Sequence, residues 1–286
     1  MTMQPQFDAK AYKVTTHNQW QEAAKAWNDW GSLLRTWLGP ATDAMLDMAG
    51  VSVGSRVLDV AAGAGDQSLS AAERVGPSGF VLATDISANI LEYAAENARI
   101  QGYDNLDTHI ADGEDLDVPA ASFDAAISRV GLIYFSDQQK ALADIRAALK
   151  PGGRFAAVVY STPQNNGFFS TPVSIIRERA KLPPPLAGQP GPFSLGGPGV
   201  LAETLENAGF ADVQERVISA PLRLPTVADC VRFERESFGA LHQMLSGLDE
   251  AAQNVVWDEI AVALANYQTP QGFSGPCELV VASGRN

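Results

Sequence analysis

Residues 57–66 read VLDVAAGAGD, an apolar run that ends near an aspartate and is followed by a glycine-containing turn. The apolar run is typical of a strand buried on both faces of a parallel sheet. Glycine-rich turns between a strand and a helix usually bind phosphate through backbone N–H groups. Here the turn is flanked by Asp59 and Asp66, whose charges would repel a phosphate. The stretch therefore predicts a strand–turn–helix unit of an open α/β sheet, with a ligand other than phosphate at the turn.

The alternation of strand-like and helix-like segments continues to residue 160, which indicates a mostly parallel sheet with helices on both faces. A capping box formed by Ser136 and Gln139 predicts the start of the last helix of this run. The expected strands are residues 56–60, 80–85, 106–112, 123–128 and 153–160, followed further along the chain by 213–219 and 278–283.

Three regions interrupt this pattern. Residues 17–49 are expected to be helical, residues 182–199 (LPPPLAGQPGPFSLGGPG) to form a long loop, and residues 226–268 to form two helices. The resulting domain organisation is a helical cap over residues 1–55 and a ligand-binding domain over residues 56–286, with lid-like insertions at about 162–199 and 223–276.

The first of these regions carries four of the five tryptophans, namely Trp20, Trp27, Trp30 and Trp37. Their rings are expected either to pack in the core or to form a lid that meets a cationic ligand through cation–π contacts.

Composition and charge exclude several classes of protein. The net charge of −13 argues against a nucleic-acid partner, which requires a basic surface, and against an anionic membrane surface. No apolar stretch is long enough for a membrane span, and no secretory signal is visible. Cys230 and Cys277 are far apart in the sequence, so neither a disulfide framework nor a metal site is expected. These features predict a cytoplasmic protein.

Three acids end successive strands: Asp59, Asp85 and Asp112. Ligands of open parallel sheets lie beyond the carboxyl ends of the strands, so these acids are expected along one rim. A dinucleotide is one candidate, because Asp85 follows Gly65 at the spacing of a ribose-binding acid. However, Ser68 stands where the third glycine of that fingerprint belongs, which disfavours an NAD(P)-linked oxidoreductase.

S-adenosylmethionine (SAM) suits such a rim better, because it has no phosphate and carries an ammonium group. Its ribose hydroxyls can donate to Asp85, and its adenine amino group can donate to Asp112. Gly63 and Gly65 allow the backbone to approach the ligand without a Cβ in the way.

Four segments in order resemble the motifs of class I SAM-dependent methyltransferases: VLDVAAGAGD (57–66), ATDIS (83–87), ADGEDLDVPAASFD (111–124) and LKPGGRF (149–155). They most resemble the branch that contains the ubiquinone/menaquinone C-methyltransferases. The resemblance implies a Rossmann-like, seven-stranded sheet whose last strand is antiparallel, with SAM as cofactor and S-adenosylhomocysteine as product. It also implies these cofactor contacts: Asp59, Ala61, Gly63 and Gly65 at the methionine end, Asp85 at the ribose, Ile86, Asp112 and Gly113 at the adenine, and the backbone of Ser128 beneath the sulfonium.

The acceptor is expected to be a small molecule methylated on oxygen, carbon or nitrogen, mainly by positioning and desolvation. Ile133 and Tyr134 stand where the quinone enzymes have Arg-Asn, which argues against a quinone precursor. Tyr134, His17 and His242 are the candidate acceptor contacts, and no catalytic residue is assigned. The alternative is a protein that binds SAM without transferring its methyl group.

Overall fold

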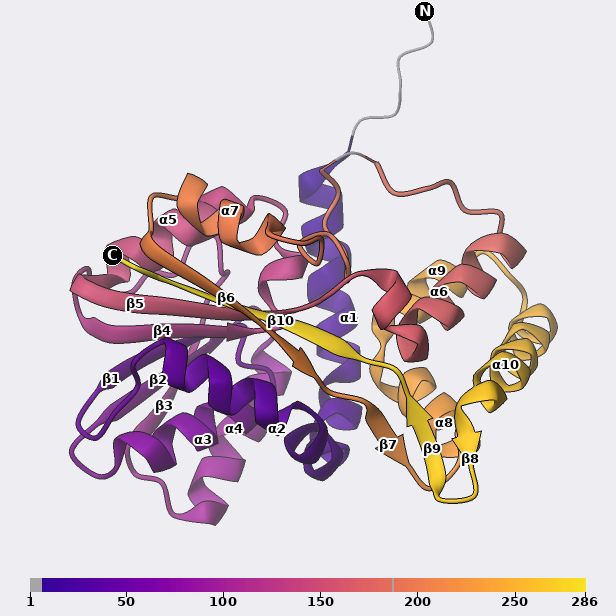
Figure 1. Cartoon of the computed structure of the whole chain (residues 1–286), viewed down its shortest axis with the longest axis horizontal. Coiled ribbons are helices and arrows are strands. Elements are labelled where there is room, and N and C mark those ends of the chain that lie inside the picture. Colours follow the sequence, from indigo (N-terminus) through magenta and orange to yellow (C-terminus); the bar gives the residue numbers. More distant parts are fainter. Residues whose placement is uncertain (1–6, 187) are drawn as a thin grey trace, which may run out of the picture.

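The computed structural model describes residues 7–186 and 188–286. Its main layer is a seven-stranded sheet with the strand order β3-β2-β1-β4-β5-β10-β6 (Figure 1). All neighbouring strands pair in parallel except β10, which is antiparallel to both β5 and β6. The predicted fold class, including the antiparallel last strand, is therefore confirmed. The strands are β1 (Arg56–Val60), β2 (Phe80–Asp85), β3 (Leu106–Ile110), β4 (Phe123–Arg129), β5 (Leu149–Tyr160), β6 (Ala211–Ser219) and β10 (Glu278–Arg285).

Helices cover both faces of the sheet. The right-handed β1-α3-β2 and β2-α4-β3 crossovers place α3 (Asp66–Val75) and α4 (Ala88–Gln101) on one face, where α2 (Gly31–Met48) packs beside α3. The other face carries α5 (Gln138–Ala148) and α7 (Val200–Asn207), which contact each other. The order of β2, β1 and β4 puts a topological switch point between β1 and β4, where open α/β sheets bind ligands.

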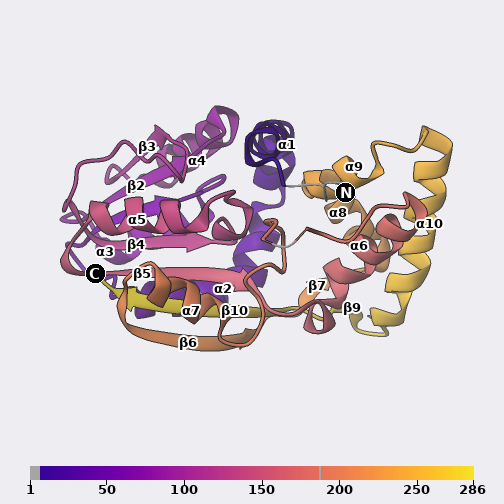
Figure 2. The same cartoon turned by 90° about the horizontal axis from the view of Figure 1, so that it is seen from above.

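The predicted helical region near the N-terminus is confirmed and consists of two helices. α1 (Ala9–Asp29) ends where Trp30 leaves helical geometry, and α2 begins at Gly31. α1 contacts α4 on one side and α8 and α9 on the other, so it lies between the sheet domain and a second group of helices (Figure 2). This helix therefore spans the region above the switch point.

The second group of helices forms a layer of its own beside the sheet. It contains α6 (Gly167–Arg179), α8 (Val227–Ser237), α9 (Gly239–Leu245) and α10 (Glu250–Leu264), together with a small sheet of β7 (Leu222–Leu224), β9 (Gly272–Gly275) and β8 (Gln268–Thr269). The expectation of two helices in 226–268 is wrong, because the chain turns at Phe238 and separates α8 from α9. The small sheet was not predicted.

Two local predictions are also wrong. Asp137, and not Ser136, caps α5, since the Asp137 side chain accepts the backbone N–H of Lys140 at 3.0 Å. The third strand ends at Ile110, which leaves Asp112 in the turn that follows.

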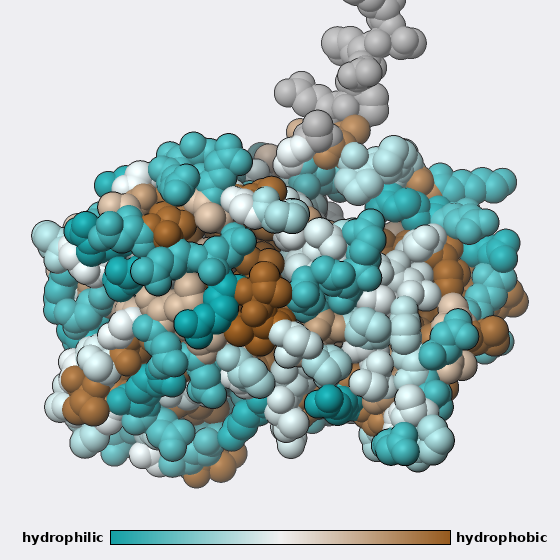
Figure 3. All heavy atoms as spheres, in the orientation of Figure 1, coloured by the Kyte–Doolittle hydropathy of each residue, from teal (hydrophilic) through white to brown (hydrophobic). Residues whose placement is uncertain are grey.

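Hydrophilic residues cover most of the face shown in Figure 3, and hydrophobic residues gather there in small groups. Within the described part of the chain, no helix is both long enough and apolar enough to cross a membrane.

Candidate functional site

A cavity of about 1180 Å³, open solvent at its mouth included, lies at the carboxyl ends of β1, β2 and β4. α1 forms its roof, and the α8–α9 junction forms its far wall. Six of the nine residues predicted to bind the cofactor line it, namely Ala61, Gly63, Asp85, Ile86, Asp112 and Gly113. Asp59, Gly65 and Ser128 do not.

The turn after β1 brings its backbone to the cavity. Ala61 and Gly63 have φ angles of 60° and 58°, in the left-handed region. The backbone N–H of Gly63 donates to Oδ2 of Asp85 at 3.0 Å, and a Cβ on Gly63 would lie 3.3 Å from the Trp27 indole nitrogen. Gly65 serves packing instead, because its Cβ would lie 2.9 Å from Cβ of Ala94 in α4.

The turn after β4 is strained. Val130 has a φ of 57°, a conformation that is unusual for a β-branched residue and costs on the order of 1–3 kcal/mol. The next residue, Gly131, could not carry a Cβ without meeting the side chain of Ala61. The turns after β1 and β4 are therefore in close contact, and both Val130 and Gly131 line the cavity. Strain of this kind is common at ligand-binding sites.

Asp85 is held by backbone donors from two elements. Its Oδ2 accepts from Gly63 and its Oδ1 accepts from the N–H of Ser87, each at 3.0 Å. Burial raises the pKa of Asp85, and these N–H groups oppose that rise. The carboxylate is thus fixed in place at the edge of the cavity, with further lone pairs free for ligand hydroxyls.

Asp59 lies beneath the turn and is fully buried. It accepts hydrogen bonds from Ser68 Oγ at 2.5 Å and from Gln67 Nε2 at 3.3 Å. Burial raises its pKa to about 7, although these two hydrogen bonds lower it. Asp59 therefore supports the turn from below and does not line the cavity.

The expected repulsion of phosphate by Asp66 is not supported. Its carboxylate pairs with Arg129 at 2.7 Å and with Arg35 at 3.3 Å, so its charge is compensated. Arg129, at the end of β4, has a side chain that is only 2% exposed and lines the cavity. Sequence reasoning missed this residue, because a basic residue at a strand end carried no recognised spacing.

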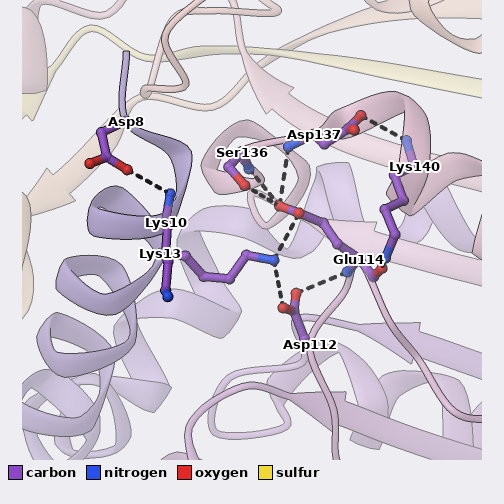
Figure 4. Close-up of polar contacts among 8 residues, drawn as sticks. All are labelled: Asp8, Lys10, Lys13, Asp112, Glu114, Ser136, Asp137 and Lys140. Carbon is purple, nitrogen blue, oxygen red and sulfur yellow. Dashed lines mark hydrogen bonds and ion pairs between the residues drawn. The ribbon is translucent and has the colours of Figure 1, made fainter. Parts of the chain in front are cut away.

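The Lys13 ammonium of α1 joins two acids of the loop after β3. It lies 2.6 Å from Oδ2 of Asp112 and 2.8 Å from Oε2 of Glu114 (Figure 4). Glu114 also accepts hydrogen bonds from the backbone of Ser136 and Asp137. Burial alone would raise the pKa of Glu114, but the hydrogen bonds from Lys13 and its other donors outweigh it and lower the pKa. This contact closes the cavity beside the predicted adenine site.

Aromatic side chains surround the other half of the cavity. Trp20 lies 5.6 Å from the Tyr134 ring and 5.5 Å from the Trp27 ring, and Trp27 lies 6.1 Å from Phe238. These four side chains and Tyr160 line the cavity. Two of the tryptophans thus reach the cavity.

The other two tryptophans of this region pack away from it. Trp37 is buried in the core, and Trp30 packs edge-to-face against Phe233 of α8.

The two candidate histidines lie outside this lining. His17 makes a weak contact with Asn18 at 3.4 Å, and His242 is exposed and contacts the backbone carbonyl of Arg235. The described residues of the loop at 182–199 also lie outside the lining, and the N–H of Gly191 donates to the carbonyl of Ile133 at 2.9 Å. Among the described residues, no group of three or more His, Cys, Asp or Glu side chains could hold a metal ion.

Comparison with known proteins gives consistent matches. The model of the ubiE/COQ5 methyltransferase family matches residues 35–174. The nocamycin O-methyltransferase of Saccharothrix syringae is 30% identical over 65% of this chain and 70% of that protein. The ubiquinone/menaquinone biosynthesis C-methyltransferase UbiE of Hahella chejuensis is 37% identical over 42% of this chain and 49% of that protein. The chain therefore spans about half the length of that relative. The YcgJ protein of Bacillus subtilis shares the fold, with a TM-score of 0.58 at 19% identity over 87% of this chain and 98% of that one.

Proposed function

This chain belongs to the class I SAM-dependent methyltransferases, and we propose that it transfers the methyl group of SAM to an oxygen atom of a small-molecule acceptor. The observation that carries the proposal is a single cavity with two different halves. One half is built from strand-end backbone and acids, and the other from aromatic side chains.

The first half fits the cofactor in shape and in charge. Gly131 has no room for a Cβ, which would collide with Cβ of Ala61. At Gly63 a Cβ would be tight, 3.3 Å from the Trp27 indole nitrogen, so bare backbone faces the ligand at both positions. In the proposed arrangement Asp85 accepts the ribose hydroxyls, and Asp112 accepts the adenine amino group.

The remaining predicted residues either flank the ligand or support the turns around it in this proposal. Ile86 and Gly113 flank the adenine, while Asp59, Gly65 and Ser128 act from beneath the turns without touching the ligand. Arg129 is proposed for the methionine carboxylate, because Arg129 is a buried cation at the end of β4.

The second half fits an apolar acceptor. Trp20, Trp27, Tyr134 and Phe238 supply flat apolar surface with polar edges. The relative named as an O-methyltransferase, which covers more of the chain than the C-methyltransferases do, favours oxygen as the methylated atom.

The proposed mechanism works by alignment. When bound, SAM supplies a methyl carbon activated by a sulfonium. The protein's part is to hold the acceptor oxygen at ~3–3.5 Å in line with that carbon, so that the oxygen–carbon bond would form as the carbon–sulfur bond breaks, and to exclude water. The proton of the acceptor hydroxyl would be released to solvent with the products. The aromatic side chains of α1 and of the α8–α9 junction perform the exclusion, so we propose that residues 1–55 and the insertions at 162–199 and 223–276 form a cap over the site.

No nucleic-acid partner is proposed. The net charge is −13, and the two basic residues that line the cavity, Lys13 and Arg129, are each paired with an acid. Nucleic-acid binding would appear as an affinity that falls steeply as salt is raised.

The test is product formation with SAM that carries a deuterated methyl group. The protein is incubated with matched panels of phenols and enols, amines, and thiols, and products are read by mass spectrometry. Transfer to the oxygen of phenols or enols, located by fragmentation of the product and lost in Asp85→Asn, supports the proposal, whereas transfer to their carbon atoms would contradict it. Transfer to amines alone would contradict O-methylation. Tight binding of S-adenosylhomocysteine with no product from any panel would instead favour a non-catalytic SAM-binding protein.

A further inference from the structure

Two polar groups on the buried face of α8 have no hydrogen-bond partner among the described residues. They are Oε2 of Glu234 and Oγ of Ser237. The two residues lie one turn apart and are at most 1% exposed. An unpaired buried polar group costs about 1–3 kcal/mol, and native structures pair nearly all of them. These oxygens therefore call for a partner that the described chain does not supply.

Ser237 is part of the cavity wall. It precedes Phe238, and both residues line the aromatic half of the cavity together with Tyr160 at the end of β5. The Phe169 ring packs against the rings of both Phe238 and Tyr160, at centroid distances of 4.7 Å and 5.9 Å. Ser237 and Tyr160 thus both contribute a hydroxyl-bearing side chain to the aromatic half of the cavity.

Glu234 lies one turn before Ser237 on the buried face of α8. In the described structure Glu234 has no ion-pair partner, and its only polar contact is a weak one from Cys230 Sγ at 3.8 Å. A buried carboxyl group without an ion-pair partner favours its neutral form, which can donate a hydrogen bond. Burial accordingly raises the pKa of Glu234 well above its ordinary value.

We infer that Ser237 and Tyr160 form an oxygen-binding subsite for the acceptor, with Glu234 as the positioning residue behind them. This inference rests on the proposed methyl transfer and names the acceptor's chemical class. The acceptor is an uncharged, mainly aromatic molecule with a phenol, enol or carbonyl oxygen. A phosphorylated or carboxylated acceptor would find no remaining cation in the cavity lining, because Lys13 pairs with Asp112 and Glu114, and Arg129 pairs with Asp66 and is already assigned to the methionine carboxylate of SAM.

The test uses three probes of one shape: 2-naphthol, naphthalene and 2-naphthylmethylammonium. Their affinities for the full chain are measured by calorimetry, with and without saturating S-adenosylhomocysteine. We expect 2-naphthol to bind about tenfold more tightly than naphthalene, because only 2-naphthol can form hydrogen bonds in the subsite. The ammonium probe should bind no better than naphthalene.

Three variants separate the roles. Ser237→Ala should weaken 2-naphthol about fivefold and leave naphthalene unchanged. Glu234→Leu should also lose the preference for 2-naphthol, whereas Glu234→Gln, which is neutral and still a donor, should keep it. Ser246→Ala, an exposed residue outside the cavity, is the matched control. Melting temperature and S-adenosylhomocysteine affinity are recorded for each variant to confirm folding.

Equal binding of 2-naphthol and naphthalene to the unmodified protein would overturn the inference, and so would an unchanged preference in Ser237→Ala. Tightest binding of the ammonium probe, lost in Glu234→Gln, would also overturn it, because Glu234 would then be an ionised carboxylate. A failure to bind S-adenosylhomocysteine would instead refute the proposed function, while the preference among probes without cofactor would still report on the subsite.

Discussion

The Lys13 ammonium lies 2.6 Å from the Asp112 carboxylate, although one residue stands in the N-terminal helix and the other in the loop after β3. The same ammonium reaches Glu114, whose carboxylate also holds the loop after β4 (Figure 4). Lys13 therefore links α1 directly to the loop after β3, and Glu114 links that loop to the loop after β4.

Removing the Lys13 ion pairs should lower the local stability of α1. The pairs are partly exposed, so Lys13→Met should cost about 1 kcal/mol of local stability. The amides of α1 should then exchange with deuterium about fivefold faster, with the strands of the sheet unchanged. Lys10→Met is the matched control, because the exposed Lys10 side chain makes no ion pair within the described residues. Equal exchange in the two variants would show that the Lys13 contact does not hold the helix.

Asp59 should make the protein less stable as pH rises. Burial raises its pKa from 3.8 to about 7, so the folded state keeps a proton between these pH values that the unfolded state has released. The stability that this group contributes is complete below about pH 4 and is lost as pH rises to about 7.

The Asp59→Asn variant should lack this decrease of stability with rising pH, which denaturant unfolding across the same pH range would measure. The variant's stability relative to the unmodified protein should increase by on the order of 4 kcal/mol between pH 4 and pH 8. Asp124→Asn is the control. Burial would raise the pKa of Asp124, but the hydrogen bonds from Lys150 and Arg56, together with the positive charges of these two residues, outweigh burial and lower the pKa. The effect of Asp124 on stability therefore falls below about pH 4. Parallel stability curves for Asp59→Asn and the unmodified protein would refute the assignment.

Gly65 is required both for its backbone angle and for packing. Gly65 and Gly102 both have left-handed φ angles, 86° and 76°, but only Gly65 has an obstacle where a Cβ would stand, Ala94 at 2.9 Å. Gly102→Ala should cost about 1–2 kcal/mol from the backbone alone. Gly65→Ala should cost a further ~1–3 kcal/mol through overpacking against α4. Equal losses in denaturant unfolding would mean that the Ala94 contact has no energetic role.

Neither candidate histidine should act as a base. His17 and His242 lie outside the cavity lining. His17→Ala and His242→Ala should each retain kcat within about threefold once an acceptor is available, whereas loss of a general base costs about 10²–10⁴. A hundredfold fall in kcat with unchanged S-adenosylhomocysteine affinity would identify the base and replace the alignment mechanism.

The strand-end half of the cavity, where the cofactor is proposed to bind, was largely predictable from the sequence, because six of the nine expected residues line it. Its residues come from short motifs in which a strand, its terminal acid and the following turn are contiguous, so spacing alone places Asp85 and Gly63 on one rim. The fold followed from the same alternation of strands and helices.

The acceptor half was not predictable in the same way. Ser237, Phe238 and Tyr160 line the same cavity although they come from α8, the α8–α9 junction and the end of β5, and no local sequence pattern records that arrangement. Arg129 was missed because its partner Asp66 stands on another element. Ser136 was assigned to a helix cap because a capping-box pattern does not reveal that Glu114 takes its hydroxyl instead.

The central claim is that the cavity binds SAM, and thermal unfolding with separate ligands tests it most directly. S-adenosylhomocysteine at a hundredfold excess over its dissociation constant should stabilise the protein by about 2.7 kcal/mol and raise the melting temperature, while NAD should leave it unchanged. Asp85→Asn should reduce the shift produced by S-adenosylhomocysteine, because the ribose loses a charged acceptor. A melting temperature raised by NAD and unaffected by S-adenosylhomocysteine would contradict the account.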